Sequence, residues 1–176
     1  MKVWLLLMYL CENFNLNIVL TGFMGAGKTT VGAHLASLTG FDFVDTDSFI
    51  EKTAGLEIND IFHIYGEKYF RTLEESCIKS ICEQSKTIIS VGGGAILNEN
   101  NVINLKKHGK IFFLDAPLSI ISQRLADCHS RPLIKNKNSI HELFIQRYET
   151  YLKTADFVID ASQSISEISQ TIISKI

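Results

Sequence analysis

Short runs of apolar residues alternate along the chain with segments whose apolar residues recur every three or four positions. The apolar runs are continuous, which is typical of strands buried on both faces of a parallel sheet. We therefore expect five strands, over residues 17–21, 41–44, 87–91, 111–114 and 157–160. The helical pattern lies between them, over residues 28–39, 48–54, 59–65, 67–84 and 117–127, a segment ending near Gly109, and two helices with capping boxes, Ser139 with Glu142 and Ser164 with Glu167. The pattern predicts an α/β fold of three layers, a parallel sheet covered by helices on both faces.

A glycine-rich loop joins the first expected strand to the first expected helix. Its sequence, Gly22-Phe-Met-Gly-Ala-Gly-Lys-Thr29, fits the pattern G-x-x-x-x-G-K-[ST] at every fixed position. In this context the backbone N–H groups and the helix N-terminus bind phosphate oxygens, Lys28 reaches the β- and γ-phosphates, and the Thr29 hydroxyl binds Mg²⁺. The nucleotide site is expected to comprise Gly22, Gly25, Ala26, Gly27, Lys28, Thr29 and Thr30.

This phosphate loop does not identify the group that receives the phosphate. The chain has no N-K-x-D element, which excludes a guanine-specific GTPase of the usual kind. With 176 residues it is also too short for the additional machinery of a motor or an AAA-type ATPase. Of the classes of P-loop protein considered, a small kinase remains.

Two further groups of residues follow the second and third expected strands. Asp45 and Asp47 end the second strand, and Gly92, Gly93 and Gly94 follow the third. The acids could simply cap the next helix, but beside a phosphate loop one can serve Mg²⁺ and the other an acceptor hydroxyl. The glycines could form a loose turn, but they also permit a close approach of the backbone to a ligand.

These motifs, and the order in which they follow one another along the chain, resemble those of the shikimate kinases, a family of small P-loop kinases. The resemblance covers roughly residues 16–176 and rests on the phosphate loop and five further elements: Asp45-Thr-Asp47, Phe70-Arg-Thr-Leu-Glu74, Gly92-Gly-Gly94, Arg131-Pro-Leu133 and Arg147-Tyr-Glu-Thr-Tyr151. It implies a strand order of 2-3-1-4-5. It also implies ATP- and Mg²⁺-dependent phosphorylation of the 3-hydroxyl of shikimate, in the chorismate pathway to aromatic amino acids.

The resemblance assigns the acceptor side of the site. Asp47 would bind the attacking hydroxyl and take its proton. Arg71 and Arg147 would hold the shikimate carboxylate, to which a guanidinium fork is matched. Gly92, Gly93 and Gly94 would line the same pocket. Glu74, one helical turn from Arg71, would orient it, and Phe62 and Phe70 fit a pocket wall, although core packing would also explain them.

The resemblance assigns the donor side as well. Thr29 and Asp45 would act on Mg²⁺, and Arg131, in a mobile lid of residues 128–138, would close over the phosphates. Arg124 would stack on adenine. Many family members place a proline on the other face of the base, but the only prolines here are Pro117 and Pro132, so residues 160–162 must frame the base differently.

Composition narrows the remaining classes. Hydrophobic residues make up 46% and charged residues 20% of the chain, which excludes a disordered protein. The net charge is -2 and no block of lysine or arginine occurs, so no nucleic-acid partner is expected. Only four of the 17 basic residues are arginines, and the resemblance places all four at ligands: Arg71, Arg124, Arg131 and Arg147. Codon bias is the alternative explanation of that scarcity.

Residues 1–15 fall outside the single kinase domain that we expect over residues 16–176. Their apolar run resembles a signal-peptide core, yet no small-residue cleavage site follows, and the run is shorter than a membrane span. Met8 is a second candidate start. The four cysteines have neither CxxC nor metal-ligand spacing, so we expect reduced thiols in a cytoplasmic protein with no membrane association. The family resemblance implies a monomer.

Two alternatives stay open from the sequence. A gluconate-type small-molecule kinase would share the phosphate loop and the acid pair, but the glycine triplet and the F-R-x-x-E helix weigh against it. A non-catalytic relative that only binds nucleotide is the second alternative, and the presence of Asp47, Arg71, Gly93 and Arg147 weighs against it.

Overall fold

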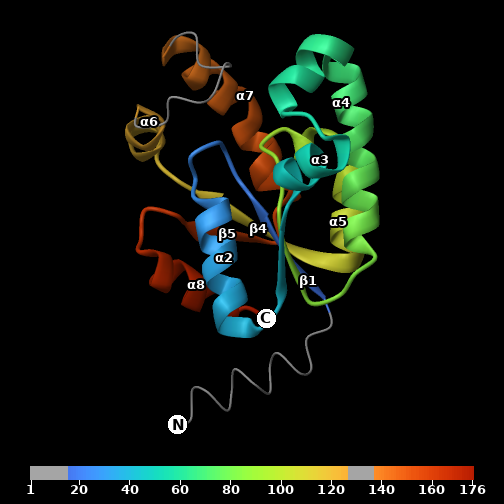
Figure 1. The fold of residues 1–176 in the computed structure, drawn as a ribbon. Coiled ribbons are helices and arrows are strands. Elements are labelled where there is room, and N and C mark those ends of the chain that lie inside the picture. The colour runs from blue at the N-terminus through green and yellow to red at the C-terminus, as the bar shows by residue number, and fades with distance from the viewer. Residues whose placement is uncertain (1–15, 127–136) are drawn as a thin grey trace.

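A parallel sheet of five strands forms the centre of the molecule (Figure 1). The structure is a computed structural model that describes residues 16–126 and 137–176. The strand order is β2-β3-β1-β4-β5, which confirms the predicted α/β fold and its order. The strands are β1 (Asn17–Thr21), β2 (Asp42–Asp45), β3 (Thr87–Ser90), β4 (Gly109–Asp115) and β5 (Phe157–Asp160). Every residue of β1 and β3 is buried, as the apolar residues at their centres predicted, and this includes the polar residues at the two ends of each strand.

Helices lie on both sides of this sheet (Figure 1). On one side α2 contacts α8 and the first three strands, and on the other α5 contacts both α4 and β4. The helices are α2 (Lys28–Thr39), α3 (Thr46–Ala54), α4 (Ile58–Cys82), α5 (Glu99–His108), α6 (Leu118–Ala126), α7 (Lys137–Thr154) and α8 (Ile165–Ile173), with a 3₁₀ turn η1 (Ala95–Leu97) before α5. Along residues 16–126 and 137–176, no helix is long and apolar enough to cross a membrane.

Helix α3 begins two residues earlier than the sequence predicted. Asp45, the last residue of β2, is its N-cap and accepts from the backbone N–H groups of Asp47 and Ser48. Asp47 therefore lies in the first turn of a helix and not in a loop after the strand. This start places Asp47 next to the end of β3, because Asp45 pairs in register with Ser90.

Helix α4 joins the two helices that were expected over residues 59–65 and 67–84. The break falls at Gly66, whose φ of 81° and ψ of 169° are not helical. A positive φ is reached readily only by glycine, so the predicted interruption exists although the two halves are continuous. The capping box of Ser164 with Glu167 at the start of α8 is confirmed.

Helix α7 begins at Lys137, which corrects two predictions. Ser139 cannot be its N-cap residue, because the helix starts before it, and residues 137 and 138 of the expected lid are helical. Apolar periodicity did not reveal this start, because polar residues fill the first turn. The rest of the expected lid up to residue 136, including Arg131, and the N-terminal residues 1–15 lie outside the described residues.

Candidate active site

The carboxyl ends of β1, β2 and β3 border a cavity of about 840 Å³. Parallel α/β sheets bind ligands at this edge. The cavity brings together nearly all the described residues that the sequence predicted for the site: Gly25 to Thr30, Asp45, Asp47, Arg71, Gly92, Gly93, Gly94, Arg124 and Arg147. One cavity therefore contains both the phosphate loop and the predicted acceptor pocket.

Gly22 is the predicted loop residue that does not line this cavity. It is buried beneath the loop with a φ of 146°, and a Cβ atom there would lie 2.8 Å from the Leu114 carbonyl oxygen. Glycine is thus required at this position by packing of the loop against β4. Its own carbonyl oxygen accepts a hydrogen bond from Lys28 Nζ at 2.9 Å, and the Phe23 carbonyl accepts a second one at 3.2 Å.

Lys28 and Thr29 follow Gly27 directly at the start of α2. Gly25 and Gly27 have positive φ values of 79° and 96°. Gly27 is the N-cap residue, so the loop leads directly into the first turn of α2. A helix N-terminus with a lysine and a hydroxyl in its first turn suits the phosphates of a nucleotide. The local geometry therefore fits the expected nucleoside triphosphate.

Asp45 joins the phosphate loop to the end of β3. Its Oδ2 atom accepts from the Thr29 hydroxyl at 2.9 Å and from the Ser90 hydroxyl at 3.0 Å, while Oδ1 caps α3. Asp45 can therefore cap α3 with one carboxylate oxygen and act on a metal ion with the other. Hydroxyl and carboxylate oxygens are donors that Mg²⁺ prefers, and the described part of the chain has no cluster of three or more His, Cys, Asp or Glu able to hold a metal ion by itself. This set fits an ion that is shared with nucleotide phosphates.

Asp47 lies against the first glycine of the triplet. A Cβ atom on Gly92 would lie 2.6 Å from Asp47 Oδ1, closer than real contacts allow. The Gly92 N–H donates to the hydroxyl of Thr46 at 3.0 Å, which holds the two segments together. Glycine at this position therefore makes room for the acid that was predicted to bind the acceptor hydroxyl.

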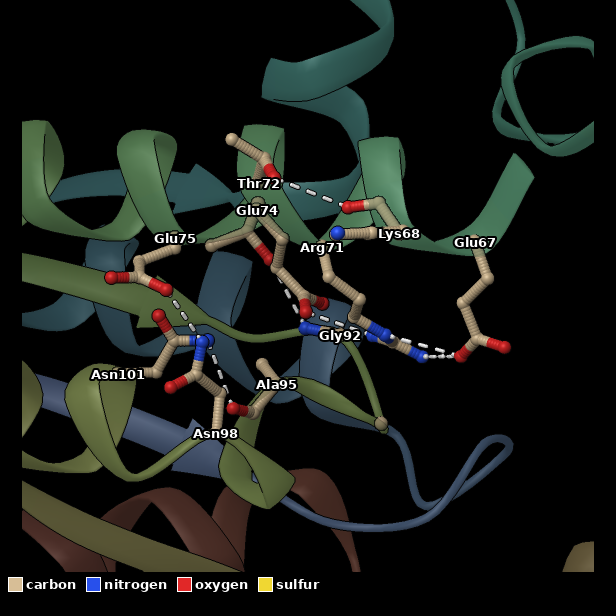
Figure 2. Close-up of polar contacts among 12 residues, drawn as sticks. Glu67, Lys68, Arg71, Thr72, Glu74, Glu75, Gly92, Ala95, Asn98 and Asn101 are labelled. Carbon is tan, nitrogen blue, oxygen red and sulfur yellow. Dashed lines mark hydrogen bonds and ion pairs between the residues drawn. The ribbon is translucent and has the colours of Figure 1, made fainter. Parts of the chain in front are cut away.

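Arg71 lies on α4 between two carboxylates (Figure 2). Its Nη1 atom contacts Glu74 at 2.8 Å, and its Nη2 atom contacts Glu67 at 3.1 Å. The Glu74 side chain is only 1% exposed, and its burial raises the pKa of its carboxyl group even though Arg71 opposes this shift. A Cβ atom on Gly94 would lie 2.8 Å from both terminal nitrogens of Arg71. The last glycine of the triplet thus makes room for the guanidinium group.

Arg147 approaches the triplet from α7. Its Nη1 atom would be 3.8 Å from a Cβ atom on Gly93, and its Nε atom is buried without a hydrogen-bond partner among the described residues. Arg71 and Arg147 therefore reach neighbouring glycines from different helices. Two guanidinium groups that border one cavity form a suitable binding site for a carboxylate.

Arg124 lies at the nucleotide side of the cavity. It is exposed and donates from Nη1 to the Gly25 carbonyl oxygen at 3.1 Å. Gln163, Ile165 and Ile168 also line the cavity. The side chain of Asp160 accepts from the Ser162 N–H at 2.9 Å and orders this segment.

The sequence motifs do not predict roles for Thr46, Ser90 or Gln163. The sequence nevertheless contains a signal for Ser90, because a polar residue near the end of an apolar strand, shortly before the glycine triplet, indicates a functional position. Thr46 lies between the two predicted acids, and this position is a signal that its hydroxyl group, which is buried in the structure, could belong to the site. Nothing in the sequence pattern separates Gln163 from other surface residues.

Comparison with known proteins gives a consistent result. The chain matches the family model described as shikimate kinase over residues 24–176. A shikimate kinase of Thermodesulfovibrio yellowstonii is 45% identical over 161 residues, which are 89% of this chain and 92% of the relative. One from Caldanaerobacter subterraneus is 40% identical, over 89% of this chain and 94% of the relative. The structure of an Acinetobacter baumannii shikimate kinase in complex with shikimate has a TM-score of 0.87 and 35% identity, and the match covers 93% of each chain.

A sugar-acid kinase has a more distant likeness. The structure of a gluconokinase from Sinorhizobium meliloti has a TM-score of 0.53 and 16% identity, over 92% of this chain and 91% of the other. At that identity the likeness shows a shared fold alone.

Proposed function

The chain belongs to the shikimate kinase family, and from this premise we propose that it phosphorylates the 3-hydroxyl of shikimate with the residues of the cavity described above. One observation carries the proposal: Asp47, Arg71 and Arg147 border the same glycine triplet in the cavity that also contains the phosphate loop. This arrangement serves an acceptor that has both a carboxylate and a hydroxyl group.

The acceptor is held by its carboxylate. Arg71 and Arg147 bind the two carboxylate oxygens, with the ring in the cavity that the glycine triplet lines. Anchoring one end of the ring places a hydroxyl at Asp47, which accepts its hydrogen bond. Fixing both partners in one cavity removes most of the entropy cost of bringing them together, which is a large part of the barrier to such reactions.

The phosphoryl group passes from ATP to the acceptor oxygen. The hydroxyl oxygen forms a bond to the γ-phosphorus, the bond from that phosphorus to the β–γ bridging oxygen breaks, and its electron pair leaves with ADP. Asp47 takes the hydroxyl proton. Lys28 and the loop N–H groups offset negative charge on the phosphates. A bound Mg²⁺ supplies further charge neutralisation there, and Thr29 and Asp45 are the residues that would hold it.

The remaining assignments concern the donor side of the site and the organisation of the chain. Arg124 stacks on the adenine ring. Arg131, which lies outside the described residues, is assigned from its match to the R-P-L pattern and offsets charge on the transferring group. The lid would lie within residues 128–138, of which the last two belong to α7. Residues 16–176 would form a single kinase domain, with residues 1–15 as an extension. A cytoplasmic monomer remains our proposal for the state of the protein.

The test is a coupled assay of ADP release with ATP, Mg²⁺ and either shikimate or gluconate. We expect turnover with shikimate and little with gluconate, because the clamp and the glycine triplet are matched to a rigid cyclic acid. Turnover on gluconate without turnover on shikimate would refute the proposal. ATP binding without turnover on either acceptor would favour the non-catalytic alternative.

A further inference from the structure

We infer that Tyr151 is a positioning residue for Arg147 and that its hydroxyl group sets the affinity for the acceptor carboxylate. This inference rests on the proposed function, because it assigns to Arg147 the binding of that carboxylate. It concerns a side chain that lies behind the cavity and is not among the residues that line it. Tyr151 acts through Arg147 and makes no contact with the reacting atoms.

The Tyr151 side chain is fixed from two sides. It is 1% exposed, and its ring stacks on Phe113 of β4 with a centroid separation of 5.0 Å and an interplanar angle of 9°. Its hydroxyl group donates a hydrogen bond to the carbonyl oxygen of Gly93, the central glycine of the triplet. A ring packed on the sheet thus places the hydroxyl group directly behind the acceptor pocket.

Arg147 lies one helical turn before Tyr151 on α7. Its Nη1 atom and the Tyr151 hydroxyl group both lie beside Gly93, 3.8 Å and 3.4 Å from the position that a Cβ atom on this glycine would take. Because the hydroxyl group donates its single hydrogen to Gly93 and a guanidinium group has only donors, the hydroxyl oxygen is placed to accept from Arg147. Burial raises the pKa of Tyr151 to about 12, so the hydroxyl group keeps its hydrogen throughout the physiological range. One oxygen atom therefore connects the triplet backbone to one arm of the proposed clamp.

Arg147 needs such a fixed partner. An arginine side chain has about 2 kcal/mol of rotamer entropy to lose when it is ordered. Arg71 is ordered by two carboxylates on its own helix, whereas Arg147 has a buried Nε atom without a partner among residues 16–126 and 137–176. The hydroxyl of Tyr151 holds Arg147 in place before the acceptor arrives, so that less ordering remains to be done upon binding.

The experiment replaces Tyr151 with phenylalanine, which removes one oxygen atom and keeps the ring that stacks on Phe113. Steady-state kinetics with shikimate and ATP should show KM for shikimate raised about tenfold, as for the loss of one hydrogen bond to a charged group. KM for ATP and kcat should stay within about twofold, because the phosphate loop and Asp47 are unchanged. A raised shikimate KM at constant kcat separates positioning from general destabilisation.

A matched control lies on the same helix. Tyr148 donates its hydroxyl to Asp115 Oδ2 at 2.9 Å, and its ring lies 5.9 Å from that of Phe113. Tyr148→Phe removes a hydroxyl group of the same kind away from the triplet and should leave KM for shikimate unchanged. An equal rise in KM in both variants would overturn the inference, because it would reflect a general effect of α7.

A double-mutant cycle tests whether the effect passes through Arg147. In an Arg147→Ala background, Tyr151→Phe should raise KM for shikimate little further, because no donor remains at position 147 for the hydroxyl group. A full tenfold rise in that background, or none in the wild-type background, would overturn the inference. If wild-type protein does not turn over shikimate at all, the proposed function fails first, and this outcome is distinct from the others.

Unfolding midpoints are recorded for each variant in the same series. Should Tyr151→Phe fail to fold, 3-fluorotyrosine at position 151 replaces it, because its hydroxyl oxygen is a poorer acceptor within nearly the same volume. A smaller rise in KM for shikimate is then expected. An unchanged KM in the fluorinated protein would refute the role of the hydroxyl group.

Discussion

The ion pairs of Arg71 permit a test that separates binding from stability. Glu74→Gln keeps the size of the side chain and an oxygen that can still accept from Arg71, but it removes the charge. The Glu74 side chain is 1% exposed and the Glu67 side chain is 66% exposed, so the two partners of one arginine differ mainly in burial. Glu67→Gln is therefore the matched control.

The expected magnitude follows from this geometry. In Glu74→Gln the 2.8 Å contact keeps the charged guanidinium of Arg71 but loses the charge of its partner. A hydrogen bond to a charged group contributes about 1.5–3 kcal/mol, and losing about half of this loosens Arg71 by roughly 1–1.5 kcal/mol. We expect a rise of about tenfold in KM for shikimate. The free energy of unfolding should change by less than about 1 kcal/mol, because removing the charge also removes its desolvation cost. Glu67→Gln should change neither quantity appreciably, since exposed pairs contribute little.

The pH dependence gives a second readout. Burial raises the pKa of Glu74 above its ordinary value of 4.5, so the folded protein binds this proton more tightly than the unfolded chain does. The contribution of Glu74 to stability is therefore fully present at low pH and is lost as the pH rises through the raised pKa. Denaturant unfolding of wild type and Glu74→Gln between pH 4 and 8 should show wild type losing stability relative to the variant as pH increases.

Two results would refute this reasoning. If Glu74→Gln lowers the free energy of unfolding by more than about 3 kcal/mol, the pair is a structural element and not a device for orienting Arg71. If KM for shikimate is unchanged while the variant folds normally, Glu74 does not position the clamp.

Three further predictions concern residues that we assign to the same active site. Asp47→Asn should lower kcat by about a hundredfold to ten-thousandfold with ATP binding preserved in calorimetry, and an unaltered rate would remove Asp47 from its role. Gly94→Ala should raise KM for shikimate strongly because its Cβ atom would meet both terminal nitrogens of Arg71 at 2.8 Å. Gly93→Ala, whose nearest neighbour would be at 3.4 Å, should fold without displacing Arg71, and equal effects on Arg71-dependent binding in the two variants would contradict this. Arg131→Ala should depress kcat while leaving shikimate binding without nucleotide nearly unchanged, as measured by fluorescence or calorimetry; a large loss of binding would place Arg131 in the acceptor pocket.

The sequence predicted most of this fold because its signals are local. Continuous apolar strands and the capping box of Ser164 each depend on a few neighbouring residues. The start of α7 was predicted wrongly because its first turn is polar, and the start of α3 was placed late because Asp45 is both a strand residue and a cap.

The site could be predicted only in part for a related reason. The phosphate loop and the glycine triplet have sequence signatures, but the purpose of each glycine depends on residues distant in the chain. Gly92 makes room for Asp47, and Gly94 makes room for Arg71. The contacts of Asp45 with Ser90 and of Tyr151 with Gly93 likewise join segments that only the folded sheet brings together.

The continuity of the cavity has a consequence for inhibition. In the part of the chain that the structure describes, no wall of protein separates the phosphate loop from the two arginines, because all of them border one space of about 840 Å³. A single compound that joins a nucleotide to a cyclic carboxylic acid through a short linker can therefore engage both subsites. Its second contact would form at an effective concentration in the millimolar range, so that two weak fragments combine into one tight ligand. Competition of such a compound against ATP and against shikimate would be the kinetic signature of this shared space.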